Sequence, residues 1–157
     1  MGRIAPALSS LSAGKTGSAV HEILNIPGTP GFLQATCGGR VVVPWMKVAE
    51  TFLLRGAGLM GRAVIPPAYG SGLFFPNCRS LHTCFMKFPL HLLFLDCEGH
   101  LLELRRHVEP WAMAKGPPGT RHCAETTVEI DLPPANTPWR WTFRPTLPEE
   151  IPDRFYP

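Results

Sequence analysis

Proline most constrains how this chain can fold, because it interrupts both helices and the interiors of sheets. The 157-residue sequence contains 18 prolines together with 15 glycines. Proline fixes φ and lacks an N–H, so helix interiors and central strands exclude it. The sequence therefore favours short strands joined by turns over long helices. Hydrophobic residues still make up 45% of the chain, which is enough for the core of a single soluble domain.

Strand-like segments follow one another from residue 40 onwards. β-branched and apolar residues that alternate with polar ones, or form short runs between turn residues, predict strands. These segments are 40–48, 70–75, 80–86, 90–96, 100–106, 126–132 and 139–143. The turn sequence DCEG at 96–99 predicts that residues 90–104 form a β-hairpin. Pro44 predicts that the strand around it lies at a sheet edge or contains a bulge.

Together these segments predict one mostly β (α+β) domain. Val48, Phe52 and Arg55 recur at helical spacing, and the glycines that follow end this helix. We expect a compact, strongly bent antiparallel sheet or a barrel-like β domain with one short helix near 48–56. Its expected organisation is a flexible N-terminal arm (1–32), a globular domain (33–132) and a Pro/Trp-rich C-terminal extension (133–157).

The charge distribution does not indicate a nucleic-acid partner. The net charge is +3, with six cations and one acid in residues 40–87 but seven cations and ten acids in residues 88–157. Nucleic-acid-binding proteins usually cluster Lys and Arg, whereas these cations are isolated along the sequence. No run approaches the ~18 apolar residues of a membrane span. The five cysteines are odd in number and irregularly spaced, so they do not indicate a disulfide framework, which favours a reducing, cytoplasmic compartment.

One motif that suggests a cofactor is rejected. Residues 56–61 (GAGLMG) fit the G-x-G-x-x-G pattern. The dinucleotide fingerprint requires a strand before it and a helix after it. Here a helical segment precedes it, and Pro66-Pro67 follows closely. We therefore expect no nucleotide at this segment, and no cofactor is predicted for the chain.

Most of the cysteines and histidines lie between residues 78 and 123. Within 77–87, period-2 alternation places Ser80, His82, Cys84 and Met86 on one strand face. On this face we expect His82 to be at least half buried. Cys78, His82 and Cys84 form an alternative set of soft metal ligands, but no second ligand pair completes a site, so no metal is predicted.

Nucleophilic catalysis by a cysteine is a further alternative. A cysteine could pair with His82 or His122, and Glu125 could orient the histidine. Such a triad is assembled by the fold, and spacing along the sequence cannot show it. No nucleophile-elbow motif is present. The sequence alone therefore does not identify an enzyme.

The order of several segments resembles the domain of unknown function family 192. These segments are GLMGR at 58–62, the stretch 72–104 with its His82-Thr83 pair and hairpin, and EPW at 109–111. The resemblance covers roughly residues 40–130. It implies a compact, mostly β domain of bacteria and archaea without an assigned activity. Many members carry an export or lipoprotein signal, so export is the alternative to a cytoplasmic location.

The chain departs from this family at one position of the hairpin. Members typically read Pro-Ile/Leu-Asp where this sequence has Pro89-Leu90-His91. A carboxylate is thus replaced by a titratable base.

The polar and soft side chains of the matching segments are the candidate ligand-binding residues. They are Arg62, Arg79, His82, Thr83 and Met86. Cations beside a histidine and a hydroxyl suit an anionic or carbonyl-bearing small molecule. We therefore expect a non-catalytic binding or accessory domain. The alternatives are a small enzyme or metal protein centred on His82 with Cys78 or Cys84, and a module that binds a protein partner through residues 133–157.

Overall fold

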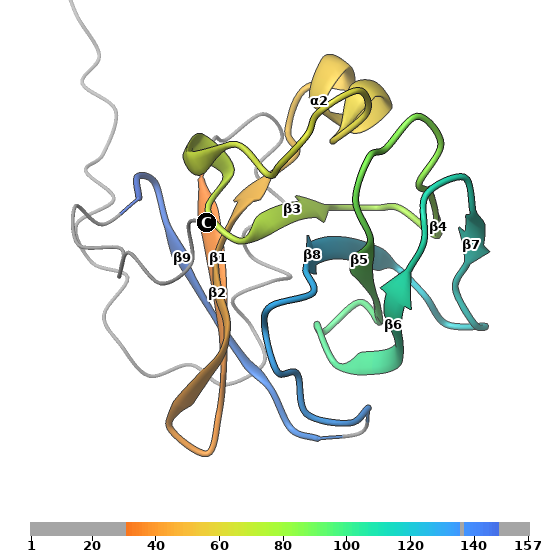
Figure 1. Ribbon diagram of the computed structural model, residues 1–157. Coiled ribbons are helices and arrows are strands. Elements are labelled where there is room, and N and C mark those ends of the chain that lie inside the picture. Colours follow the sequence, from red (N-terminus) through yellow and green to blue (C-terminus); the bar gives the residue numbers. More distant parts are fainter. Residues whose placement is uncertain (1–30, 136, 148–157) are drawn as a thin grey trace, which may run out of the picture.

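The computed structural model describes residues 31–135 and 137–147 (Figure 1). The expected arm up to residue 30, with any leader in it, and the end of the chain from residue 148 lie outside the described residues. The elements in chain order are β1 (Phe32–Cys37), β2 (Arg40–Val48), α2 (Phe52–Ala57), η1 (Pro67–Tyr69), β3 (Gly72–Phe75), β4 (Ser80–His82), β5 (Leu90–Leu95), β6 (Leu101–Val108), β7 (Met113–Lys115), β8 (His122–Thr127) and β9 (Arg140–Arg144).

The strands form one large sheet and one small one. The seven-stranded sheet has the order β6-β5-β8-β3-β2-β1-β9, and β4 pairs with β7 separately. All pairs are antiparallel except β2 with β3. The sheet bends strongly, since β1, β2 and β9 run steeply across the direction of β3 and β8 (Figure 1). The prediction of a mostly β, strongly bent sheet is confirmed, and the sheet is open because β6 and β9 are not paired with each other.

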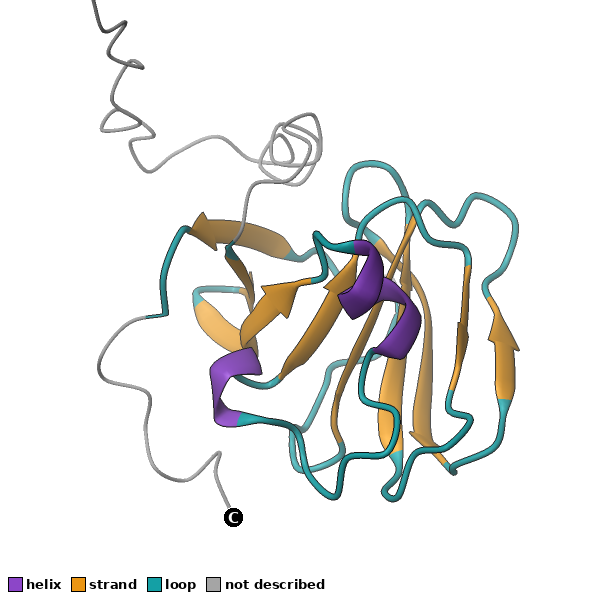
Figure 2. Ribbon diagram, turned by 90° about the horizontal axis from the view of Figure 1, so that it is seen from above, coloured by secondary structure: helices purple, strands orange, loops and turns teal. Residues whose placement is uncertain are grey.

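The predicted hairpin and helix are both present. β5 and β6 pair across the turn at 96–99, where the Asp96 carboxylate accepts hydrogen bonds from the N–H groups of Glu98 and His100. The α2 helix begins after Thr51, whose hydroxyl accepts a hydrogen bond from the Leu54 N–H at 3.1 Å. It ends at Gly58, which has a positive φ of 48°. Figure 2 shows α2 and η1 outside the strands.

Pro44 lies at a bulge in the interior of the sheet. Leu33 faces Met46 and Ala35 faces Val43, so β2 has one more residue than β1 over this interval. β2 lies between β1 and β3, which excludes the edge position and leaves the bulge as the correct alternative. The carbonyl that the bulge exposes at Pro44 accepts a hydrogen bond from the Ser71 hydroxyl at 2.9 Å.

Both faces of the sheet are covered by apolar side chains. On β5, Leu93 and Leu95 belong to one core cluster, whereas Leu90, Leu92 and Phe94 belong to a second. The two sets alternate along the strand, as period-2 geometry requires. A side chain on the second face of β5, β3 or β8 therefore points into an apolar layer.

Two predicted strands have different bounds in the structure. The strand expected at 80–86 ends at His82, because Thr83 turns the chain and Phe85 has a positive φ of 61°. The strand expected at 126–132 is β8, which begins at His122 and ends at Thr127. The single strand face expected to carry Ser80, His82, Cys84 and Met86 therefore does not exist.

The segment after residue 132, which the sequence predicts as a C-terminal extension, returns to the sheet. β9 pairs with β1 over five residues. Trp139 and Trp141 are buried in the first core cluster, and Phe143 packs against it. The predicted common face of these three aromatic residues is confirmed, and it points into the core.

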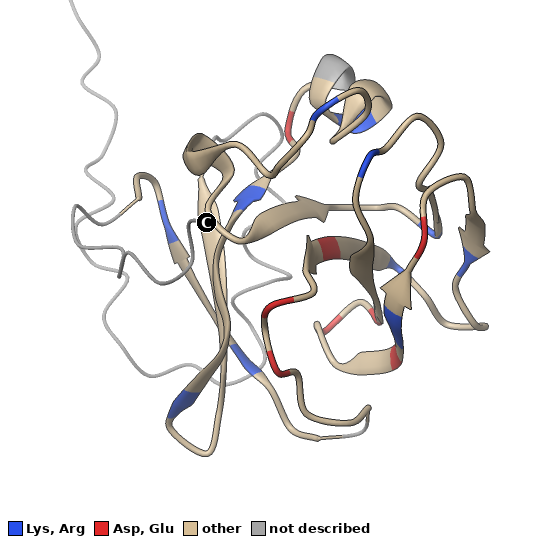
Figure 3. Ribbon diagram, viewed as in Figure 1, with Lys and Arg blue, Asp and Glu red and all other residues tan. Residues whose placement is uncertain are grey.

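Lys and Arg residues are distributed over many elements rather than along one stripe (Figure 3). In the part of the chain that the structure describes, none of the helices has the length and hydropathy needed to cross a membrane.

Candidate functional site

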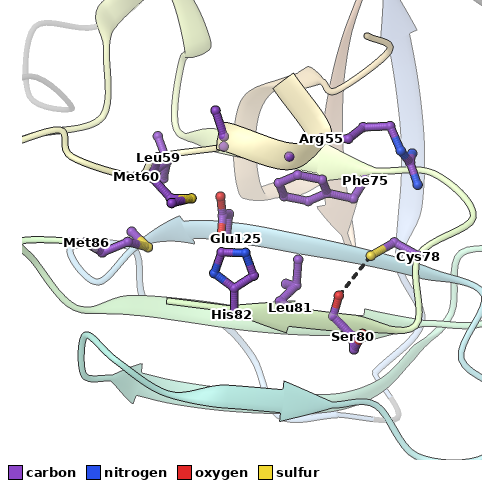
Figure 4. Close-up of a pocket in the computed structure, with 13 residues that line it drawn as sticks. Arg55, Leu59, Met60, Phe75, Cys78, Ser80, Leu81, His82, Met86 and Glu125 are labelled. Carbon is purple, nitrogen blue, oxygen red and sulfur yellow. Dashed lines mark hydrogen bonds between the residues drawn. The ribbon is translucent and has the colours of Figure 1, made fainter. Parts of the chain in front are cut away.

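A cavity of about 150 Å³ lies between the C-terminal end of α2 and strands β3, β4 and β8 (Figure 4). Its apolar lining residues are Leu59, Met60, Phe75, Leu81 and Met86. Its polar lining residues are Arg55, Cys78, Ser80, His82 and Glu125. The lining is about equally polar and apolar, and a concave site with convergent polar groups of this kind can orient a small ligand. We call it the Glu125 cavity.

Glu125 is an acid at a core-facing position of β8. It follows Cys123 by two residues, so both side chains point to the second face of the sheet. Only 3% of Glu125 is exposed. Its carboxyl points toward the end of α2 (Figure 4), where a Cβ atom on Gly58 would lie 3.4 Å from Oε1. No residue within the described ranges donates a hydrogen bond to this carboxyl.

Burial raises the pKa of the Glu125 carboxyl to about 8, and the nearby Cys78 contributes in the same direction. Desolvation favours the uncharged form of an acid, and a second acidic group beside it has the same effect. Near pH 7 the carboxyl is therefore mostly protonated. In this form it can donate a hydrogen bond from its hydroxyl and accept one at its carbonyl oxygen.

The Cys78 thiol lies at the wall of the same cavity, and the Cys123 thiol is buried in the core next to it. The Cys78 thiol donates to the Ser80 carbonyl at 3.0 Å, and the Cys123 thiol donates to the Cys78 carbonyl at 3.1 Å. Both cysteines are free. When Cys78 is ionised, a hydrogen bond from the Cys123 thiol to its sulfur lowers the pKa of Cys78, against the effect of burial and with help from Ser80 and Arg55. The pKa of the Cys123 thiol is raised by its contact with Cys78 and by burial.

We expect iodoacetamide to alkylate Cys78 at pH 7 faster than it alkylates an unperturbed cysteine, although Cys78 is half-buried. The thiolate is the reactive form, so a lowered pKa increases the rate. Peptide mass spectrometry over time measures the rate at each cysteine. Cys123→Ala should slow the reaction of Cys78 because it removes the donor, and Cys123→Ser should preserve the rate. Equal rates in these two variants would contradict this account of Cys78.

The five candidate residues predicted from the sequence do not come together. His82 and Met86 line the Glu125 cavity, whereas Arg79 lines a different one. His82 is exposed at its rim, so its expected burial is wrong. It lies at the end of β4, where only Leu81 points inward.

The remaining two candidates have structural contacts. Thr83 is fully buried, and its hydroxyl donates to the Glu109 carbonyl at 2.8 Å and accepts from the Ala112 N–H at 2.9 Å. The Arg62 guanidinium lies 5.3 Å from the centre of the Tyr69 ring and donates to its hydroxyl at 3.3 Å. Neither residue lines the Glu125 cavity.

The ligand set of the metal alternative is not assembled. Cys78 and His82 line the cavity, but Cys84 does not. Over the described ranges, no group of three or more His, Cys, Asp or Glu residues has the arrangement of a metal site.

One of the two catalytic alternatives is excluded by strand geometry. His122 and Glu125 are three residues apart on β8 and therefore point to opposite faces. His122 instead accepts a hydrogen bond from the Asn77 N–H at 3.1 Å and contacts the Phe74 ring. Glu125 therefore cannot orient His122.

His91, the position at which the sequence departs from the family it resembles, supports a β-bulge. The β5–β6 register shifts between Leu90 and Leu92, and His107 opposite has a positive φ of 51°. The His91 Nδ1 accepts a hydrogen bond from the His107 N–H at 3.0 Å. Burial lowers the pKa of His91, with Arg106 as a further cause, which keeps this nitrogen available as an acceptor. An Asp carboxylate offers the same acceptor chemistry.

Glu125 was predicted from the sequence only as an orienting residue, and Arg55 was not predicted as a site residue. The useful signal was local: Cys123 and Glu125 alternate with Ala124 and Thr126, as expected for one face of a strand. It was missed because the strand was expected to start at residue 126, four residues after its actual start at His122.

Two solved structures resemble this fold. One is a protein of unknown function from Novosphingobium aromaticivorans DSM 12444, with 15% identity and a TM-score of 0.56, covering 71% of this chain and 83% of that one. The other, from Sinorhizobium meliloti 1021, is provisionally described as a transcription regulator. It has 15% identity and a TM-score of 0.56, covering 75% of this chain and 96% of that one. At this level of identity they show a shared fold alone.

The sequence comparison agrees with the resemblance seen in the motifs. No curated protein matches the chain. A family model described as Uncharacterized ACR, COG1430 matches residues 34–133, which include the whole Glu125 cavity. The chain therefore belongs to the DUF192 family of uncharacterised proteins.

Proposed function

We propose that this domain binds a small carbonyl-bearing molecule in the Glu125 cavity without catalysing a reaction on it. The proposal rests on one observation: Glu125, which is 3% exposed, lines the cavity, and its carboxyl has no hydrogen-bond partner among the described residues. Its carboxyl faces the cavity, so a ligand bound there can form the hydrogen bond that the surrounding residues do not supply.

The protonation state of Glu125 defines the chemistry of the ligand. With a pKa of about 8, the carboxyl carries a proton at pH 7 and offers a donor to a carbonyl oxygen. Leu59, Phe75 and Leu81 favour an apolar body next to that oxygen. The volume of about 150 Å³ is close to that of an engineered cavity that binds benzene, so the ligand has only a few heavy atoms.

A cysteine-dependent enzyme is the second candidate function, favoured by the lowered pKa of Cys78 at the same cavity. A catalytic thiol is usually activated by a base within hydrogen-bond reach. The hydrogen bonds of Cys78 go to Ser80, Arg121 and Cys123, and His82, the histidine that lines the same cavity, is not among these partners. This arrangement supports binding over nucleophilic catalysis.

The test is ligand-observed NMR with acetone, acetamide and cyclohexanone as carbonyl probes and methylammonium as a cationic probe. We expect the carbonyl probes to bind at pH 6 and to bind about tenfold more weakly at pH 9, because ionisation above pH 8 removes the donor. Glu125→Gln keeps a donor and should bind without this pH dependence, whereas Glu125→Leu should not bind. Glu129→Gln removes an exposed acid near the same strand and serves as the control.

Two results would contradict the proposal. One is binding of methylammonium that strengthens as the pH rises, since a cation needs the ionised carboxylate. The other is carbonyl binding that Glu125→Leu leaves unchanged.

A further inference from the structure

A second cavity, of about 460 Å³, is lined by three cations and by no carboxylate. The cations are Arg79, Lys115 and Arg121, and the remaining lining consists of Cys97 and the loop 116–120. We call it the Arg79 cavity. Its volume lies within the roughly 300–1,000 Å³ of small-molecule sites. It shares no lining residue with the Glu125 cavity.

Backbone hydrogen bonds fix the three segments that carry these cations. The Gly116 N–H donates to the Arg79 carbonyl at 2.9 Å, which joins the residue before β4 to the residue after β7. The Arg121 N–H donates to the Leu95 carbonyl at 2.7 Å, and its carbonyl accepts from the Cys78 N–H at 3.0 Å. The cations are therefore brought together by the fold from separate parts of the sequence.

The loop between Lys115 and Arg121 is a rigid wall of the cavity. The Thr120 N–H and hydroxyl both donate to the Pro117 carbonyl, at 3.1 and 2.7 Å. A Cβ atom on Gly116 would lie 2.4 Å from the Thr120 hydroxyl and 2.6 Å from the Phe94 ring, so the loop packs directly on the core. A preorganised wall reduces the entropy lost when a ligand binds.

The charges at this cavity are unbalanced. All three side chains belong to exposed residues, and none of them forms an ion pair with any residue that the structure describes. Like charges around a concave surface reinforce one another and concentrate anions there. Guanidinium groups also match the oxygens of phosphate in a bidentate geometry.

We propose that the Arg79 cavity is a binding site for a small multivalent anion of the phosphate or pyrophosphate type. This site is independent of the Glu125 cavity, and the carbonyl ligand proposed there does not require it. Three cations on different segments suit an anion with several charged oxygens better than one with a single charge.

The test is isothermal titration calorimetry, which measures the Kd of inorganic pyrophosphate for the full chain at 150 mM NaCl. Each guanidinium supplies charge-assisted hydrogen bonds to the anion, so Arg79→Gln and Arg121→Gln should each raise Kd about tenfold or more. The triple variant that also carries Lys115→Gln should not bind. The control removes three exposed cations elsewhere (Arg40→Gln, Lys87→Gln and Arg140→Gln) and should change Kd by less than about twofold.

Cys97 supplies a second readout, because its exposed thiol lines the same cavity. Pyrophosphate should slow the alkylation of Cys97 by iodoacetamide in the wild-type chain and leave it unchanged in the triple variant. Absence of saturable binding, or an equal loss of binding in the control variant, would overturn the proposal. Binding of a single-stranded oligonucleotide without binding of pyrophosphate would overturn it as well, in favour of a nucleic-acid surface.

Discussion

Replacing Glu125 with glutamine is expected to stabilise the folded domain by about 5 kcal/mol at pH 9 and by only about 1 kcal/mol at pH 5. Folding raises the pKa of this carboxyl from 4.5 to about 8. The folded state therefore holds the proton more tightly than the unfolded state, and the stability contributed by Glu125 is lost as the pH rises from 4.5 through 8. A tenfold change in proton affinity corresponds to about 1.36 kcal/mol, and glutamine does not titrate.

The difference in unfolding free energy between the two proteins is measured by urea denaturation at pH 5, 7 and 9. Other titrating groups contribute to both proteins and largely cancel in the difference. Glu129→Gln, which changes an exposed acid, should show a small difference that does not grow with pH. A pH-independent difference for Glu125→Gln would show that the carboxyl is ionised in the fold.

Trp141→Ala is expected to destabilise the domain by about 3–5 kcal/mol. Trp141 is only 8% exposed and contacts the edge of the Phe74 ring at a centroid distance of 5.6 Å. Its Nε1 donates to the Gly99 carbonyl at 2.8 Å, so it also joins β9 to the turn of the β5–β6 hairpin. The substitution leaves a large cavity and a carbonyl without its donor.

Urea denaturation at pH 7 measures this loss. The matched control is Trp111→Ala, because Trp111 is 63% exposed and its removal opens no buried cavity. The control should change stability by less than about 1 kcal/mol. Equal effects of the two substitutions would contradict the assignment of β9 to the folded domain.

Local patterns in the sequence were sufficient for much of the fold. The β5–β6 hairpin was predicted because its strands and its turn signals are neighbours along the chain. A helix was predicted over 48–56 from the spacing of Val48, Phe52 and Arg55, and α2 is present but begins at Phe52, because Val48 is the last residue of β2. The face shared by Trp139, Trp141 and Phe143 followed from alternation alone.

Long-range contacts account for the predictions that failed. Thr83 turns the chain away from β4 because its hydroxyl bonds to Glu109 and Ala112, more than 25 residues away. β9 was assigned to an extension because the C-terminal residues are rich in proline, whereas its pairing partner β1 lies about 100 residues earlier. Neither partner can be inferred from the sequence near the segment itself.

The candidate site was harder to predict than the fold, for the same reason. Arg79 and His82 are three residues apart in sequence but line different cavities, because β4 separates their surroundings. The cations that do lie around Arg79 come from residues 115 and 121. Only the fold brings such groups together, so sequence spacing could not distinguish the two cavities.

The pKa of the Glu125 carboxyl, followed by ¹³C NMR of the selectively labelled side chain, is the most direct test of a buried, uncharged acid in the cavity. The structure predicts a midpoint near pH 8 in the ligand-free domain. A carbonyl ligand that accepts a hydrogen bond from protonated Glu125 should raise this midpoint further, since it binds only the protonated form. A midpoint at or below 4.5 would show an ionised, solvated carboxylate and contradict the account of this cavity.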